Sequence, residues 1–193
     1  MSVQSFFKVI YCLALTFVVG VVGVFAYPLY SVPAAQAQAA QGGFPLYSWG
    51  SNDNGNLGHG EPPGGSNHIP RRIDGGARWI ASATSASGAI AVDSLGRIYT
   101  WGVDSPQRGL NPALGNRQRS VPTRIEGTSN FESVFAFGNN AAAICSGGNL
   151  YTWGGAGVLG RPTPAGQADW QPTRVQPQSG WETASIGGVV IAI

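Results

Sequence analysis

The sequence has little charge and almost no cysteine, and both shortages limit what the protein can be. Charged residues make up 10% of the 193 residues, where an ordinary soluble domain has roughly 25%. Beyond residue 37, ten arginines face nine acidic residues, and this near-neutral balance gives no electrostatic reason to expect nucleic-acid binding. Cys12 lies in an N-terminal apolar run, so Cys145 stands alone in the remainder. The fold beyond that run must therefore rest on packing rather than on a disulfide.

Motifs for catalysis and metal binding are also missing. The sequence has no His-Glu-x-x-His, Gly-x-Ser-x-Gly or Gly-x-x-x-x-Gly-Lys pattern, and its only histidines, His59 and His68, are too few for a zinc site. Residues 52–56 look like a calcium loop but lack the closing Glu, so we interpret them as a turn. Cys145 ends an apolar stretch and is expected to be a small buried thiol. We predict that the protein is not an enzyme and holds no metal and no cofactor.

The N-terminus is a separate segment with the order of a secretory signal. Lys8 is the only lysine, residues 9–26 carry no charge, and prolines and an Ala-x-Ala run follow. That order predicts a signal peptide over 1–37. Eighteen apolar residues as a helix would reach about 27 Å, close to a bilayer core of about 30 Å, so an N-terminal membrane anchor through residues 9–26 is the alternative. Both predict an extracellular or cell-surface protein, with a linker over 38–45.

One short stretch, Tyr-x-Trp-Gly, is written three times at a fixed period. Trp49, Trp101 and Trp153 are 52 residues apart, and such regularity indicates one supersecondary unit copied beside itself. The repeats run over 46–97, 98–149 and an incomplete 150–193. Apolar and polar residues alternate around each Trp as they do in a strand. The glycines that end these strands are Gly50, Gly102 and Gly154.

Each repeat continues with further strand signals in the same order. A loop of varying length leads to Pro70, Pro122 or Pro172, an aromatic residue opens the next strand, and an apolar run closes the unit. About four strands in about 50 residues, rich in glycine and aromatics, predicts an all-β fold of four-stranded antiparallel propeller blades preceded by an N-terminal hydrophobic helix. Variable loops beside constant strands predict that the loops share a surface. The three tryptophans are expected to pack between blades rather than to stack on glycans.

The motifs resemble the regulator of chromosome condensation repeat family. The resemblance rests on Tyr-x-Trp-Gly, then Asn-x-x-Gly-x-Leu-Gly-x-Gly, Pro-x-x-Ile and a Gly-led apolar strand, read over residues 46–92 and recurring more weakly to residue 193. A kelch-type blade fits less well, because kelch blades separate Tyr from Trp by several residues. The resemblance implies a seven-bladed ring, and 46–193 supplies under three blades. We therefore expect a piece of a longer propeller, or a protomer that self-associates through open blade edges.

The candidate binding residues are three arginines, Arg72, Arg124 and Arg174, which follow the recurring prolines at equivalent places. Equivalent places on successive blades form a row, which could bind an acidic partner or simply keep a strand soluble. The leading hypothesis is an exported, non-catalytic protein-interaction module with an unknown protein partner. A cell-wall or glycan-binding adhesin is one alternative. Members of the family are exchange factors for a small GTPase, and the predicted export argues against that activity here.

Overall fold

The computed structural model describes residues 42–86, 88–103, 109, 119–155, 157–162, 169–187 and 190–193. These residues form an all-β structure, and the predicted N-terminal helix, signal and anchor lie outside them. In the described part of the chain, no helix has the length and hydropathy needed to cross a membrane. The strands are Tyr47–Ser51 (β1), Ser66–Arg72 (β2), Trp79–Ser85 (β3), Gly88–Asp93 (β4), Ile98–Gly102 (β5), Arg119–Arg124 (β6), Phe131–Phe137 (β7), Asn140–Cys145 (β8), Leu150–Gly154 (β9), Asp169–Arg174 (β10), Ala184–Ile186 (β11) and Val190–Ala192 (β12).

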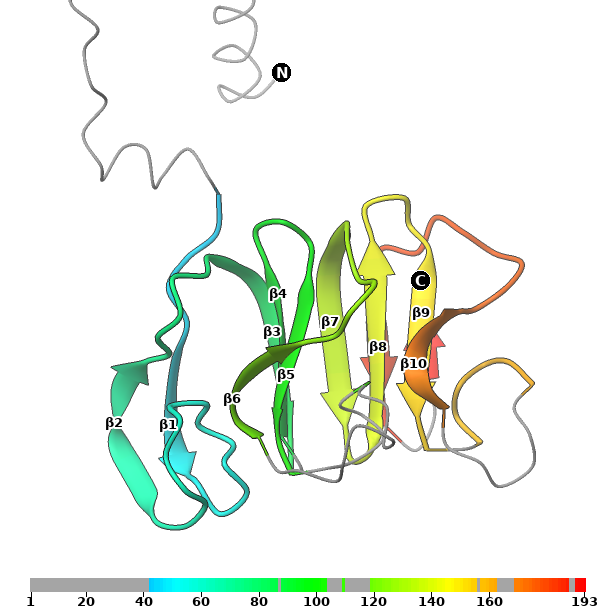
Figure 1. Cartoon of the computed structure of the whole chain (residues 1–193). Helices are drawn as coiled ribbons and strands as arrows, with labels where there is room; N and C mark the ends of the chain where they lie inside the picture. The colour runs from blue at the N-terminus through cyan, green and yellow to red at the C-terminus, as the bar shows by residue number, and fades with distance from the viewer. Residues whose placement is uncertain are drawn as a thin grey trace, which may run out of the picture. The chain divides into compact units, whose positions relative to one another are not determined.

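The strands make two complete antiparallel sheets and two strand pairs. The complete sheets have the orders β3-β4-β5-β6 and β7-β8-β9-β10, and the pairs are β1-β2 and β11-β12. Figure 1 shows the two complete sheets standing side by side, with β3 and β4 against β7. The strands that carry the Tyr-x-Trp-Gly motif, β1, β5 and β9, thus lie in three separate sheets. This is the arrangement of successive packed sheets that the repeat predicts.

The sheets are offset from the sequence repeats by half a unit. Residues 46–97 supply β1 and β2 of one sheet and β3 and β4 of the next, and residues 98–149 supply β5 to β8 in the same way. Each complete sheet therefore takes its first two strands from one repeat and its last two from the following repeat. The chain passes from sheet to sheet in the middle of every repeat.

The core lies between the sheets, because both faces of the central strands are covered. Every residue of β4 is buried, and one cluster joins Ile90, Val92 and Ile98 of the first complete sheet to Phe131, Val134 and Trp153 of the second. A second cluster lies between β1-β2 and the first complete sheet. A third joins the second complete sheet to β11 and β12. Burying a large apolar side chain contributes about 1.5–3 kcal/mol, so neighbouring sheets stabilise one another.

Candidate protein-binding surface

The arginine row lies at the ends of the fourth strands. Arg72 ends β2, Arg124 ends β6 and Arg174 ends β10. Each is the cross-strand partner of a repeat tyrosine, in the pairs Tyr47↔Arg72, Tyr99↔Arg124 and Tyr151↔Arg174. Directly opposed residues on antiparallel strands share a face and touch through their side chains. The structure therefore gives the three arginines one recurring position, each directly opposite a repeat tyrosine on the neighbouring strand.

Within the described residues, these three arginines have no carboxylate partner. Arg124 makes only a long Nη2 contact of 3.5 Å to the Thr128 carbonyl. The other exposed or half-buried arginines of the sheets differ, because several are neutralised nearby. Arg97 pairs with Asp93 at 2.6 Å, Arg161 pairs with Asp169 at 2.6 Å, and Arg71 pairs with Glu61. Arg78 and Arg119 also lack a carboxylate partner among the described residues, so what distinguishes the row is its recurring position at the ends of the fourth strands.

The electrostatics of the neighbouring groups follow from burial and these pairs. Burial raises the pKa of Tyr99 above its ordinary value, and the Asp93 carboxylate raises it further, while Arg97 and Arg124 act in the opposite direction. Hydrogen bonding to Asp93 raises the pKa of Arg97. Tyr99 is therefore neutral and Arg97 charged at any physiological pH. Tyr99, the cross-strand partner of Arg124, therefore brings no negative charge that would cancel that of the Arg124 guanidinium.

The tryptophans occupy a recurring socket formed by the preceding sheet. Trp101 is 2% exposed, its Nε1 donates to the Asn56 carbonyl at 2.8 Å, and its ring lies against Gly58 and Ile73. A Cβ on Gly58 would come within 2.8 Å of the Trp101 ring nitrogen, so only glycine fits there. Trp153 is fully buried in the next sheet. Gly109 lies beside its ring, since a Cβ there would be 3.1 Å from the Trp153 ring nitrogen.

Trp49 differs from the expectation that all three tryptophans pack between sheets. It is 61% exposed, because the side on which Trp101 and Trp153 meet a preceding sheet has no such sheet among the described residues. The glycines after the three tryptophans all have positive φ: Gly50 at 110°, Gly102 at 114° and Gly154 at 127°. Gly154 also lies against Asn140, where a Cβ would be 2.7 Å from Cα. Gly102 and Gly154 end their strands and Gly50 stands one residue before the end of β1, and at all three positions an L side chain would be strained.

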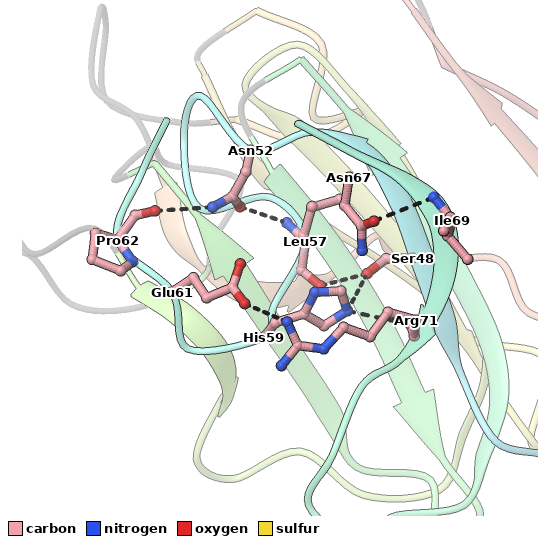
Figure 2. A network of polar contacts seen from close by, with 9 residues as sticks. All are labelled: Ser48, Asn52, Leu57, His59, Glu61, Pro62, Asn67, Ile69 and Arg71. Atoms are coloured by element: carbon pink, nitrogen blue, oxygen red, sulfur yellow. Dashed lines mark hydrogen bonds and ion pairs between the residues drawn. The ribbon is translucent and has the colours of Figure 1, made fainter. Parts of the chain in front are cut away.

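The loop after Trp49 is held by a polar network (Figure 2). Asn52 is buried, its Nδ2 donates to the Pro62 carbonyl at 3.0 Å, and its Oδ1 accepts the Leu57 N–H at 3.3 Å. Ser48 Oγ donates to the Leu57 carbonyl at 2.6 Å. Thr152 makes the same 2.6 Å bond to the Leu159 carbonyl. The Leu-Gly turns of the first and third repeats are therefore fastened by the same hydroxyl-to-carbonyl bond.

Ser48 and His59 are 3.0 Å apart but do not form a nucleophile and base. The Ser48 hydroxyl proton goes to the Leu57 carbonyl, and His59 Nε2 also lies 3.2 Å from the Arg71 carbonyl, to which it can donate. His59 thus fastens the loop to β2, as Arg161 fastens its loop by donating to the Thr152 carbonyl at 2.9 Å. His68 is exposed and touches Ser66. No group of three or more metal-binding side chains occurs in the described ranges.

Cys145 departs from the buried thiol that the sequence predicts. It is half-buried and takes the strand position of Asp93, since Trp79↔Asp93 and Phe131↔Cys145 are equivalent pairs. Burial alone would raise the pKa of Cys145, but hydrogen bonds from the backbone of Asn149 and Gly147 outweigh it and lower that pKa. The hairpin whose N–H groups bond to the Asp93 carboxylate in one repeat thus holds a thiol of lowered pKa at the equivalent position of the next.

Comparison with known proteins identifies the repeat. Residues 45–92 match the family described as the regulator of chromosome condensation (RCC1) repeat. This segment is an RCC1 repeat. The chain is 34% identical over 127 residues to the mitochondrial RCC1 domain-containing protein RUG3 of Arabidopsis thaliana, covering 61% of this chain and 27% of that protein. It is 27% identical over 145 residues to the human regulator of chromosome condensation, covering 69% of this chain and 34% of that protein.

Solved structures show the same fold. Prp20p of Saccharomyces cerevisiae matches with a TM-score of 0.65 at 21% identity, over 76% of this chain and 38% of that one. Human WBSCR16 matches with a TM-score of 0.62 at 20% identity, over 76% and 39%. The four-stranded sheets therefore have the fold of propeller blades. The chain spans between 27% and 39% of the length of these four relatives.

Two features of the surface were not predicted from the sequence. One is the tyrosine–arginine pairing, although its signal was present: Tyr47 to Arg72 and Tyr99 to Arg124 are both 25 residues. The other is the difference in side-chain exposure among the tryptophans of the three Tyr-x-Trp-Gly motifs, which no local pattern could distinguish. Side-chain burial here depends on which sheet lies next, and that information is not local.

Proposed function

We propose that this chain is a non-catalytic protein-interaction module whose arginine row binds an acidic segment of a partner protein. The observation that carries the proposal is the row itself: three guanidiniums at one recurring blade position, none with a carboxylate partner in the described residues. Arginine suits such contacts because its planar guanidinium can donate two parallel hydrogen bonds to one carboxylate. An interaction role also agrees with the relatives, since Prp20p of yeast has binding properties to Gsp1p and histones.

The test uses the full chain and a fluorescent twelve-residue polyglutamate peptide. Changing all three arginines to Gln should weaken binding at low salt by about tenfold or more, since each exposed charge pair contributes up to about 1 kcal/mol. A control with the same loss of charge changes three arginines outside the row, Arg71, Arg78 and Arg119, and should keep most of the affinity. Equal losses in both variants would show that only net charge matters, and would reject the row.

Two other activities are separated by parallel assays. If the chain is a glycan-binding adhesin, it should bind a neutral cell-wall polysaccharide, and changing the three row arginines to Gln should not alter that binding. An exchange factor would speed nucleotide release from a small GTPase. Either result, combined with no peptide binding, would replace the present proposal.

We also propose that the repeats act outside the cytoplasm. The support is the order of Lys8, an uncharged run over 9–26 and Ala-x-Ala near residue 37. This order is typical of a segment that a signal peptidase cleaves, and the uncharged run could instead insert into a membrane. Protease added to intact cells should digest the repeats, and the mature N-terminus should start after Ala37 or Ala39 if the segment is cleaved. Full protection from the protease would reject export.

A further inference from the structure

A cavity of about 730 Å³ lies where the first complete sheet passes into the second, and two arginines of the row border it. Its walls are the β6–β7 loop, residues 125–130, and residues of β7 to β10. Arg124 directly precedes this loop, and its Nη2 lies 3.5 Å from the carbonyl of Thr128 in the cavity wall. Arg174 is the cross-strand partner of Tyr151, which lines the opposite wall. The cavity is therefore bordered by two neighbouring members of the row.

The size of the cavity follows from two differences between successive repeats. In the first complete sheet, Arg97 bonds to the Asp93 carboxylate at 2.6 Å, and its guanidinium lies 5.8 Å over the Tyr99 ring. The cavity at this equivalent place is lined by Arg97 and measures about 370 Å³. In the second sheet the same two positions, 52 residues later, are Cys145 and Asn149. Because no long guanidinium covers it there, the repeat tyrosine of the second sheet lines a larger space.

The cavity walls combine an apolar, aromatic part with a polar rim. Ile125 and Phe131 are buried, and the rings of Phe131 and Tyr151 meet edge to face with centroids 5.0 Å apart. Ser129 and Ser146 are exposed residues of the lining and bring hydroxyl groups to the entrance. Aromatic rings pack favourably on further rings at such spacings, and an amphipathic ring keeps its polar edge towards water. These walls therefore suit a flat group that enters from solvent.

Charge decides between the two flat groups that proteins offer, a guanidinium and an aromatic ring. Arg97 covers its tyrosine beside the buried carboxylate of Asp93. Among the described residues that line the larger cavity, the one charged side chain is Glu126, which is exposed. Arg124 and Arg174 border the same cavity, so a further cation there would meet two positive charges and lack a buried counter-charge. A neutral aromatic ring avoids that repulsion.

We propose that the acidic segment of the partner carries an aromatic residue between its acidic residues, and that this ring binds in the cavity against Tyr151. The flanking carboxylates then bind Arg124 and Arg174. The inference rests on the proposed function, because the row supplies the charges on either side of the ring. Aromatic side chains that fill a pocket inside a polar rim carry much of the binding energy of protein interfaces. The row thus selects acidic segments, and the cavity selects among them those with a central ring.

The test compares fluorescent twelve-residue polyglutamate peptides on the full chain at low salt, with Trp, Ala or Arg replacing one central glutamate. The Trp peptide should bind at least about tenfold more tightly than the Ala peptide, the effect expected of an interface aromatic. The Arg peptide should bind no more tightly than the Ala peptide. Equal affinities for the Trp and Ala peptides overturn the inference and leave the row intact, and so does an Arg peptide that binds most tightly. Loss of binding for all three rejects the proposed function as well.

The matched variant closes the cavity by copying the preceding repeat. Cys145→Asp combined with Asn149→Arg places the ion pair of Asp93 and Arg97 in the β8–β9 hairpin and leaves the net charge unchanged. This variant should bind the Ala peptide as the wild type does, which also reports that it is folded, and should lose the advantage of the Trp peptide. Leu95→Ala, which removes a side chain of 65% exposure on the β4–β5 turn, is the control and should keep that advantage. A Trp advantage that survives in the double variant overturns the inference.

A second measurement locates the ring in the wild-type chain and needs no variant to fold. A polyglutamate peptide with p-benzoylphenylalanine in place of the central Trp forms covalent cross-links on illumination, and mass spectrometry identifies the residues reached. The cross-links should fall within residues 125–131 and 145–151, which supply most of the cavity lining. An excess of the Trp peptide should suppress them, and an equal excess of the Ala peptide should suppress them far less. Cross-links confined to other parts of the chain show that the ring binds elsewhere and overturn the inference.

Discussion

Trp101 and Trp49 occupy the same position in the same motif, yet one is 2% exposed and the other 61% exposed. Both follow a tyrosine by two residues, both precede a glycine of positive φ, and both lie on the third strand of the blade pattern. The difference is the neighbour. Around Trp101 the preceding sheet supplies Gly58, Ile73 and the Asn56 carbonyl, while nothing comparable in the described residues covers Trp49. In this fold, burial is a property of the interface between blades rather than of the motif.

The largest effect expected from this comparison is on folding stability. Trp153→Ala should lower the free energy of unfolding by about 3–5 kcal/mol, because it leaves a cavity between two complete sheets. Trp49→Ala should change it by less than about 0.5 kcal/mol in the monomer, where the ring is already in solvent. Urea denaturation of both variants at nanomolar concentration measures the contrast. Similar losses would mean that Trp49 is covered in solution by the chain itself.

A smaller effect should separate the two Leu-Gly turns. Gly58→Ala puts a methyl group 2.8 Å from the Trp101 ring nitrogen, so it should cost about 1–3 kcal/mol of overpacking beyond the strain of positive φ. Gly160→Ala meets only Val175, at 3.6 Å, and should cost about 1 kcal/mol from backbone strain alone. Thermal unfolding of the two monomers gives the ranking. If Gly160→Ala proved the more destabilising, Gly160 would be the more closely packed of the two glycines in solution.

The smallest effect concerns the ion pair of Arg161 and Asp169, beside the Leu159-Gly160 turn. Burial raises the pKa of Asp169, but bonds from the Gln171 N–H, Arg161 and Thr173 outweigh it, and the pKa lies below its ordinary value. A lowered folded pKa gives stability that is present above the unfolded pKa of about 3.9 and is lost as pH falls through the folded pKa. Asp169→Asn should therefore cost up to about 1 kcal/mol at pH 7, and the difference should vanish in acid.

Urea midpoints at several pH values test this dependence, with Glu61→Gln as the matched control. Glu61 pairs with Arg71 where both side chains are about half exposed, so its loss should be near zero at every pH. If Asp169→Asn lowered the free energy of unfolding by the same amount at every pH, the carboxylate charge of Asp169 would not be what stabilises the turn.

Much of the fold could be predicted because the repeat carries it. Periodic Tyr-x-Trp-Gly, Leu-Gly and Pro-x-x-Ile signals place most of the strands, and their recurrence implies stacking. What could not be predicted is the half-unit offset of the sheets, since the strongest motif lies on the third strand and suggests the wrong boundary. The ion pair of Arg97 and the surroundings of the Cys145 thiol could not be predicted either, because they depend on cross-strand register. The residues of the arginine row were found from spacing alone, and their tyrosine partners only from the sheet.

The offset between repeat and sheet has a consequence for how the protein comes apart. In most repeat arrays an end unit can fray by itself, because its contacts are internal plus one border. In this chain, local unfolding of one sequence repeat would remove two strands from each of two adjacent blades. Local melting should thus spread across at least two blades at once, and hydrogen exchange should report a single cooperative block where a modular array would show graded protection.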